Sequence, residues 1–294
     1  MSSPGYKPKV SLLVTDLDNT LWDWFHAWYA SFGALLDGVV RVTGVSRKQL
    51  EDEIRVVHQR RGTSEYSWLL YEIPSVIAYC GDADPFVVFR DVLHEQNSAR
   101  LYQSRLYDGV LETLQAVRGA GVPIVAYTES QAYWTKWRMT KLGLDGVIDC
   151  LYSSPDHDSP RGLSPAEKRF DPTQDMSLKK TKHRHVHGGI LKPNPKILEE
   201  ILGEYDVPLD EVLYVGDSLM KDVAMGQAVG VIDAHALYGV AHERPAYDQL
   251  RRVSHWTDED VERERLTAPG ATPQPTYIIT AGLDEILEQF TFGE

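Results

Sequence analysis

Short apolar runs alternate with helical patterns along most of this chain of 294 residues, and that alternation limits the folds open to it. Stretches with a 3.6-residue period, such as "VLETLQAVRGAG" and "NPKILEEILGEY", separate the runs. Apolar strands that alternate with helices form parallel sheets covered on both faces. We therefore predict an α/β fold built on a doubly wound, Rossmann-like parallel sheet. Its strands are expected at residues 9–16, 122–128, 146–153, 211–217, 230–234 and 276–281.

Two segments interrupt this alternation. Residues 21–105 show helical periodicity almost throughout and no convincing strand, which predicts a smaller all-helical domain inserted after the first strand. Residues 1–20 and 106–294 would then form the α/β core. Residues 153–189 are rich in Pro, Ser, Asp, Lys and His, so we expect a polar surface insertion within that core.

The acidic composition disfavours several classes of partner. A formal net charge of −13 argues against broad binding to nucleic acid or to an anionic membrane surface. No apolar stretch approaches the roughly 20 residues that span a bilayer, and the opening "MSSPGYKPKV" lacks the apolar core of a signal peptide. The two cysteines, Cys80 and Cys150, indicate neither a disulfide framework nor a zinc knuckle. We expect a soluble cytoplasmic protein, and no pattern indicates its oligomeric state.

Two aspartates stand where the first strand should end, in "DLDNT". Positions i and i+2 of an extended segment point the same way, so Asp16 and Asp18 can face one site. One carboxylate can then act as a nucleophile while the other moves a proton, provided that their environments differ. For either aspartate alone, a helix cap or an Asx-turn is the more ordinary interpretation.

Further polar residues follow other predicted strands. Thr128 ends "VAYT", Lys192 precedes a helix that starts with proline, and Asp217 ends "YVGD", with Asp222 in the next helical turn. Each alone has an ordinary explanation as a loop hydroxyl, a solvated charge or a first-turn acid. Together they gather carboxylates at one edge of the sheet, where the acids repel one another unless a cation such as Mg²⁺ lies among them. This combination suits phosphoryl transfer, in which Mg²⁺ and Lys192 offset the charge of the phosphate.

These motifs together resemble the haloacid dehalogenase superfamily, and within it the phosphatase branch with a type-one helical cap. Its four motifs occur in order as "DLDNT", "YTES", Lys192 in "LKPNP", and "GDSLMKD". The resemblance implies that Asp16 forms an aspartyl phosphate, and that Asp18 protonates the leaving oxygen and later activates water. It also implies that Thr128 and Lys192 bind the phosphate. The implied Mg²⁺ ligands are Asp16, the main-chain carbonyl of Asp18, Asp217 and Asp222.

The same resemblance implies a role for the helical insertion. Residues 21–105 lie where the superfamily places its cap domain, a lid that excludes water and contacts small substrates. The implied function is Mg²⁺-dependent hydrolysis of a phosphomonoester of a small cytoplasmic metabolite. A phosphomutase on the same scaffold and a non-catalytic binding protein are the alternatives. Superfamily members that cleave carbon–halogen bonds lack an acid at the position of Asp18, so its presence disfavours dehalogenation.

Two side chains near the motifs raise separate questions. Glu129 stands in motif two where a small or amide residue is common, so its carboxylate either points away or belongs with the phosphate-binding residues. Trp22 lies in the hinge between core and insertion and is a candidate for contact with substrate. The rings directly after it have helical spacing, which favours packing within the insertion over a ligand-binding role. These rings are Trp24, Phe25 and Trp28.

The segment "KHRHVH" is a weaker signal. A strand there would present His183, His185 and His187 on one face, where three imidazoles can bind zinc. Basic neighbours favour a solvated loop instead, and such a loop would attract anionic substrates towards Lys192. These neighbours are Lys179, Lys180, Lys182 and Arg184.

Overall fold

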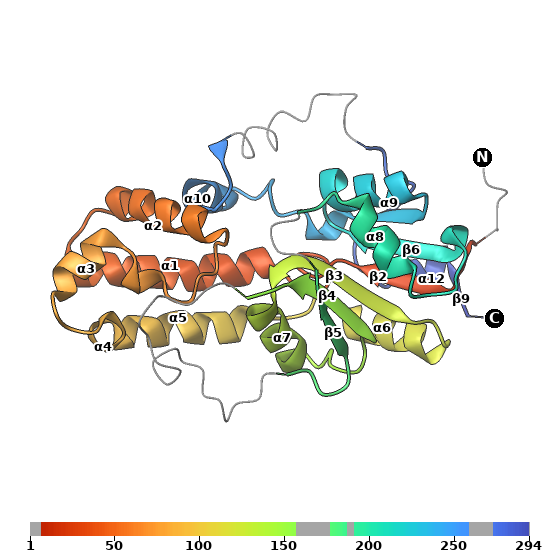
Figure 1. Ribbon diagram of the computed structural model, residues 1–294, viewed down its shortest axis with the longest axis horizontal. Helices are drawn as coiled ribbons and strands as arrows, with labels where there is room; N and C mark the ends of the chain where they lie inside the picture. Colours follow the sequence, from red (N-terminus) through yellow and green to blue (C-terminus); the bar gives the residue numbers. More distant parts are fainter. Residues whose placement is uncertain (1–6, 157–176, 187–190, 259–272, 294) are drawn as a thin grey trace.

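The computed structural model describes residues 7–156, 177–186, 191–258 and 273–293, and it contains a large parallel sheet (Figure 1). Seven strands lie in the order β5-β4-β3-β2-β6-β7-β8, and each neighbouring pair is parallel. A separate parallel pair joins β1 (Lys9–Val10) to β9 (Thr291–Phe292). The strands of the large sheet are β2 (Leu12–Thr15), β3 (Ile124–Gln131), β4 (Cys150–Ser154), β5 (Lys182–His185), β6 (Val212–Gly216), β7 (Ile232–Ala236) and β8 (Tyr277–Ile279).

The strand β2 lies at the centre of the sheet and leads into the first motif. From β2 the chain builds β3, β4 and β5 on one side, and then returns to build β6, β7 and β8 on the other. Neighbouring residues of β2 point to opposite faces, because Leu13 packs into one core and Leu12 and Val14 pack into another. Sheets of this kind bind ligands at the carboxyl ends of the strands, where the strand order reverses.

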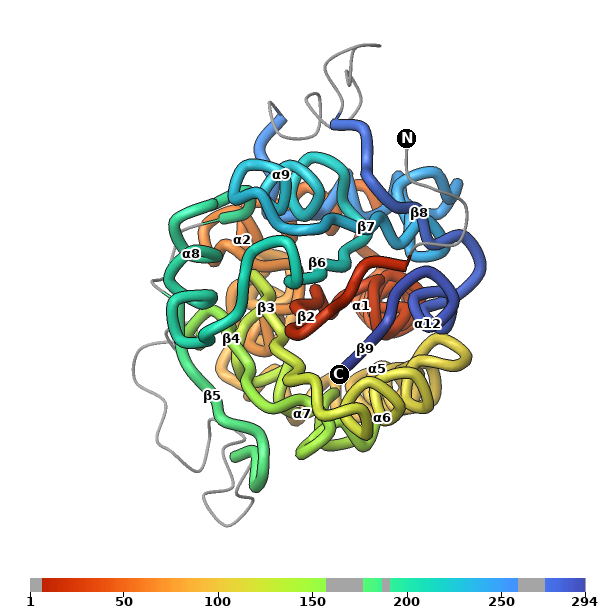
Figure 2. The backbone as a smooth tube through the Cα atoms, turned by 90° about the vertical axis from the view of Figure 1, so that its right-hand side faces the viewer, coloured from red at the N-terminus to blue at the C-terminus, as the bar shows by residue number. Residues whose placement is uncertain are grey.

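Helices cover both faces of the sheet and make the α/β domain a three-layer structure (Figure 2). The predicted fold class, a doubly wound parallel sheet, is confirmed. One face packs against α6 (Val110–Gly119), α7 (Ala132–Lys141) and α12 (Glu285–Gln289). The other face packs against α8 (Pro195–Leu202) and α9 (Ala224–Val229). Short turns complete the domain: η2 (Leu209–Glu211), η3 (Leu219–Val223) and η4 (Leu237–Gly239).

A third core lies in the helical lobe, which begins directly after the first motif (Figure 1). The carboxylate of Asp23 caps its first helix by accepting the His26 N–H at 2.9 Å, and Gly44 ends that helix with a φ of 72°. Phe25 and Trp28 are each 2% exposed in this core, so their predicted packing is confirmed. The lobe consists of α1 (Trp24–Thr43), α2 (Arg47–Arg61), η1 (Leu69–Tyr71), α3 (Pro74–Cys80), α4 (Pro85–Val88), α5 (Arg90–Gln103) and α10 (Tyr247–Val253).

The helix α10 packs in the helical lobe although it follows β7 in the chain. Leu250 and Val253 are buried in the core of the lobe, and Arg252 pairs with Glu51 of α2 at 2.9 Å. The predicted helical domain, 21–105, does not include this segment. A short amphipathic helix shows which of its residues will be buried but not which element will cover them. The chain from β7 to α10 therefore connects the lobe to the α/β domain at a further place.

The predicted polar surface insertion, 153–189, holds a strand where its composition predicts a loop. The strand β5 pairs with β4: the Lys182 N–H donates to the Asp149 carbonyl at 2.9 Å, and the Val186 N–H donates to the Ser153 carbonyl at 3.0 Å. An outer strand of a sheet can carry charged side chains because water reaches it. The strand β5 therefore lacks the apolar run by which the other strands were predicted. Residues 157–176 and 187–190 of this insertion lie outside the described residues. No helix in the described ranges has the length and apolar character needed to cross a bilayer.

A buried histidine at the contact between α2 and α10 predicts acid sensitivity of the lobe. The Nδ1–H of His58 donates to the Val253 carbonyl at 2.6 Å, and burial lowers the pKa of His58 to about 4. The unfolded chain takes up this proton near pH 6.5, so the free energy of unfolding should fall as the pH drops from 6.5 to 4, by roughly 3 kcal/mol in total. Chemical unfolding of His58→Gln should show a correspondingly smaller fall. The same change at the exposed His94 is the control, and equal pH dependence in all three proteins would contradict the prediction.

Candidate active site

The central strand leads into the residue that the sequence predicts as the nucleophile. The carboxylate of Asp16 is buried and accepts hydrogen bonds from Lys192 Nζ at 2.6 Å and from Thr20 Oγ1 at 3.3 Å. Burial, opposed by the charge of Lys192, raises the pKa of Asp16 to about 7. Asp16 is therefore fixed in orientation, in a place where water contributes little to its solvation.

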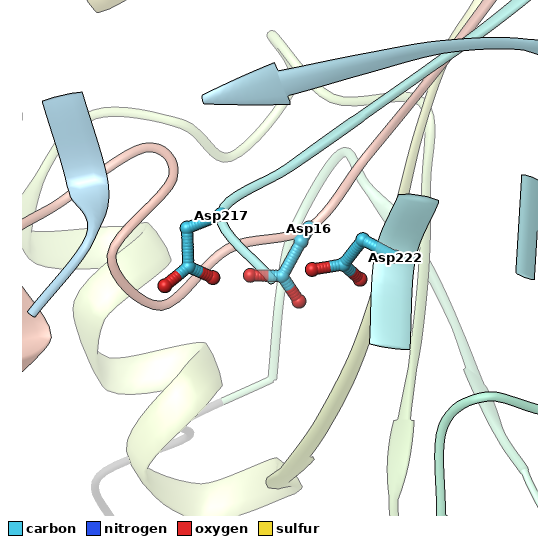
Figure 3. A group of neighbouring side chains, drawn as sticks. All are labelled: Asp16, Asp217 and Asp222. Carbon is cyan, nitrogen blue, oxygen red and sulfur yellow. The ribbon is translucent and has the colours of Figure 1, made fainter. Parts of the chain in front are cut away.

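Two more acids gather around Asp16, one after β6 and one in η3 (Figure 3). One oxygen each of Asp16, Asp217 and Asp222 lies within 4.8 Å of the other two. Lys192 Nζ also donates to Asp222 Oδ1 at 2.8 Å, so a single ammonium bridges two of the acids. Burial, and then the charges of Asp16 and Asp222, raise the pKa of Asp217 well above its usual range. When ionised, three carboxylates with one lysine leave an excess of negative charge, and this repulsion is what raises these pKa values beyond the effect of burial.

The chemistry of this donor set fits Mg²⁺. The three side chains offer only carboxylate oxygens, which are the hard donors that Mg²⁺ prefers, and a divalent cation would offset their mutual repulsion. Within the described ranges, no other group of Asp, Glu, His or Cys side chains has the spacing of a metal site. The predicted metal ligands Asp16, Asp217 and Asp222 are thus brought together.

Two glycines allow the chain to approach this group closely. A Cβ on Gly216 would lie 2.3 Å from Asp222 Cγ, and a Cβ on Gly239 would lie 1.7 Å from the carbonyl oxygen of Asn19. Neither clash could be relieved by a small shift of a flexible side chain, because one involves backbone and the other a buried acid. Glycine at these positions is therefore a requirement of the site's geometry.

The second acid of the first motif has its own set of partners. Asp18 Oδ1 accepts the indole N–H of Trp22 at 2.6 Å, and Asp18 Oδ2 accepts the hydroxyl of Ser130. The Nη1 atom of Arg138 lies 3.9 Å from Asp18 Oδ1. Burial raises the pKa of Asp18, and the charge of Arg138 opposes that rise. Two acids with different surroundings meet the condition for a division between nucleophile and proton carrier.

The two motif-two residues have different surroundings. Thr128 is 2% exposed, and its Oγ1 accepts the Ser130 N–H at 3.1 Å. The carboxylate of Glu129 accepts the Lys192 N–H at 2.5 Å and pairs with Lys221 Nζ at 2.6 Å. Both carboxylate oxygens of Glu129 are therefore engaged by groups of the protein, and the side chain supports the chain at Lys192. The assignment of Glu129 to the phosphate-binding residues stays a prediction.

Two further predictions concern a tryptophan and the histidines. Trp22 is 2% exposed and its indole N–H donates to Asp18, so the structure places it beside the second acid, and its contact with substrate stays a prediction. His183 and His185 lie on one face of β5 with ring centroids 4.6 Å apart, as a strand requires. His187, the third histidine of the zinc-binding alternative, lies outside the described residues.

Three residues that contact or approach Asp18 were not found from the sequence: Ser130, Arg138 and Glu65. Ser130 shares strand β3 with Thr128 at a spacing of two, which is a usable signal. Arg138 carries no such signal, because a single arginine on an amphipathic helix normally faces water. Glu65 belongs to the helical lobe and reaches the site only through the tertiary structure.

Comparison with known proteins identifies similar sequences and folds. The model for a family described as haloacid dehalogenase-like hydrolase matches residues 10–230. No curated protein matches the chain. YfnB from Bacillus subtilis, described as a HAD-hydrolase bound to magnesium, has 13% identity and a TM-score of 0.50, with coverage of 95% of this chain and 98% of YfnB.

Two other solved structures match with slightly lower scores. A HAD phosphatase from Thermococcus onnurineus has 16% identity and a TM-score of 0.49, covering 96% of this chain and 99% of its own. A 2-haloacid dehalogenase from Pseudomonas syringae has 17% identity and a TM-score of 0.49, and the match covers 95% of this chain and 97% of the dehalogenase. At these identities the likeness of YfnB shows the fold alone, and the other two add no argument about activity.

Proposed function

This chain belongs to the haloacid dehalogenase-like hydrolase family, and on that premise we propose that it is a Mg²⁺-dependent phosphatase acting on phosphomonoesters of a small metabolite. The observation that carries the proposal is the pair Asp16 and Asp18, a buried and a partly buried acid with separate partners after one central strand. A halide leaves as a stable anion and needs no proton, whereas an alkoxide leaving group needs one. Asp18 therefore supports phosphoester hydrolysis over carbon–halogen cleavage.

In the proposed reaction, Asp16 attacks phosphorus, and the bond from phosphorus to the leaving oxygen breaks as the aspartyl phosphate forms. Asp18 gives its proton to the leaving oxygen, which departs as an alcohol. Water then attacks phosphorus, Asp18 takes a proton from that water, and inorganic phosphate leaves with Asp16 restored. Lys192 places a positive charge beside Asp16, where the phosphoryl group is transferred. Mg²⁺ held by Asp16, Asp217 and Asp222 would supply further positive charge.

The helical lobe supports a small substrate. Its helix α1 begins directly after the first motif, so the lobe adjoins the carboxyl ends of the strands (Figure 1). Glu65 of the lobe also pairs with Arg138 of α7, next to Asp18. A lobe in this position limits the space around the acids and favours a small phosphorylated molecule over a macromolecule.

The direct test is the release of inorganic phosphate from a panel of small phosphomonoesters with Mg²⁺, repeated in EDTA. We expect turnover of at least one ester with Mg²⁺ and its loss in EDTA. Movement of phosphate to another hydroxyl of a sugar, without free phosphate, would identify a phosphomutase. Halide release from 2-haloacids would identify a dehalogenase, and binding without turnover across the panel would identify a non-catalytic protein. Each of these three outcomes contradicts the proposal.

The contacts of Glu129 predict a measurable role in phosphate binding through Lys192. Glu129→Ala removes the acceptor of the Lys192 N–H, so the KM of a phosphoester and the inhibition constant of inorganic phosphate should rise about tenfold. Glu129→Gln keeps an acceptor for that N–H and loses only the ion pair with Lys221, so both constants should change by less than about threefold. Tighter phosphate binding by Glu129→Ala would show that the negative charge of Glu129 outweighs its support of Lys192.

A further inference from the structure

Arg138 is a buried cation beside the proposed proton carrier. Its side chain is 1% exposed, its Nη2 donates to Glu65 Oε1, and its Nη1 lies 3.9 Å from Asp18 Oδ1. The Nε and Nη1 atoms are buried and have no hydrogen-bond partner. Burying a guanidinium with unused donors costs free energy, and structures keep such groups where their charge serves a purpose. Glu65 takes up Nη2, and the acid nearest to the unused Nη1 is Asp18.

Glu65 holds this arginine from the helical lobe. Its carboxylate accepts the indole N–H of Trp24 at 2.8 Å in addition to Arg138, and its carbonyl oxygen accepts the indole N–H of Trp134 at 3.1 Å. These donors come from α1 of the lobe and from α7 of the α/β domain. Glu65 is therefore fixed by both parts of the molecule, and it fixes Arg138 in turn.

We propose that Glu65 and Arg138 are positioning residues for Asp18, so that the helical lobe completes the proton-transfer apparatus of the α/β domain. This inference rests on the proposed phosphatase function. When Asp18 gives its proton to the leaving oxygen, a negative charge forms on its carboxylate. Arg138 already stands beside that carboxylate, in a place with little water, and stabilises the charge without rearrangement. Arg138 does not touch the substrate in this scheme and acts through Asp18.

The test uses two substrates of similar shape that differ in their need for a proton. Phenyl phosphate has a poor leaving group, whereas 4-nitrophenyl phosphate has a good one that departs without protonation. Arg138→Met should lower kcat/KM for phenyl phosphate about 100-fold and for 4-nitrophenyl phosphate by less than about threefold. Glu65→Gln should give the same pattern with a smaller loss, because Arg138 remains but is held less firmly.

Two further variants keep the test decisive. Arg138→Met leaves the partly buried Glu65 without its ion pair, so the double variant Glu65→Gln with Arg138→Met provides a neutral pair that should fold and retain the selective loss. Arg118→Met, which breaks an exposed ion pair with Asp149, is the matched control. It should leave kcat/KM unchanged for both substrates. If the folded double variant loses kcat/KM equally on both substrates, or loses it on neither, the inference is overturned. The proposed phosphatase function would still stand. A wild-type protein inactive on both substrates and on the phosphomonoester panel would overturn the proposed function itself.

Discussion

Asp16→Asn is expected to abolish phosphate release, with kcat lowered by a factor of roughly 10⁴ or more, because the amide cannot form the covalent intermediate. Asn keeps nearly the shape of Asp and can still accept the hydrogen bond from Lys192. The measurement is phosphate release on the best ester of the panel, together with trapping of a phosphorylated protein by rapid acid quench. Wild type should give a labelled protein and Asp16→Asn none.

The stability of this variant separates a lost nucleophile from a lost fold. Burial raises the pKa of Asp16 to about 7, so between about pH 4 and 7 the folded protein holds a proton that the unfolded chain has released. The Asp16 contribution to the free energy of unfolding therefore falls as the pH rises through this window. Asn cannot ionise, so Asp16→Asn does not lose free energy of unfolding in this way as the pH rises. At pH 8 in EDTA it should therefore unfold at a temperature no lower than wild type does. A folded Asp16→Asn protein with wild-type turnover would refute the nucleophile assignment.

Asp18→Asn is the comparison that distinguishes the two acids. This variant keeps the nucleophile and loses the proton carrier, so it should still form the phosphorylated protein from 4-nitrophenyl phosphate, whose leaving group needs no proton. Its turnover should then stop at the intermediate, because Asp18 also activates water. The two variants would therefore differ in labelling although both are inactive. Equal absence of label in both would contradict the separate roles of Asp16 and Asp18.

The sequence predicts the part of the site that lies at the ends of buried strands. Asp16 and Asp217 follow apolar runs, and such runs identify buried parallel strands whose carboxyl ends meet at one edge. Lys192 and Asp222 stand before or within helical turns and could be placed near that edge for the same reason. Local sequence pattern was sufficient for these residues because parallel strands of one sheet end at the same edge. A residue directly after such a strand is therefore placed at that edge.

The remaining features depend on tertiary contacts that no local pattern records. The strand β5 is short and charged and lies at the edge of the sheet, so it lacks the apolar run that marks the others. The helix α10 reveals an apolar face but not its partner in the lobe. Arg138 and Glu65 look like ordinary surface charges until the lobe and α7 come together. The structure was needed because the burial of these side chains is determined by elements distant in sequence.

Lys192→Met should impair both catalysis and stability, because this lysine is the cation that joins two buried acids. Its Nζ donates to Asp16 Oδ1 at 2.6 Å and to Asp222 Oδ1 at 2.8 Å, and it lies 4.8 Å from the ring centroid of Tyr127 and 5.7 Å from that of Tyr214. Methionine keeps the packing of the stem between these rings and removes the charge. We expect kcat/KM to fall by about 10³-fold and the free energy of unfolding in EDTA to fall by roughly 3–5 kcal/mol.

The response of this variant to Mg²⁺ tests the proposed metal site at the same time. Without the lysine, the three carboxylates repel one another more strongly, so a cation bound among them should stabilise Lys192→Met more than wild type. Unfolding is therefore measured in EDTA and in excess Mg²⁺ for both proteins. Lys221→Met is the comparison, since that lysine pairs with Glu129 and its charge acts on Asp217 less strongly than that of Lys192 does, so its loss should give a smaller increase. If Mg²⁺ shifts all three proteins equally, Asp16, Asp217 and Asp222 do not form the metal site, because the charge balance at these acids would then have no effect on the binding of the ion.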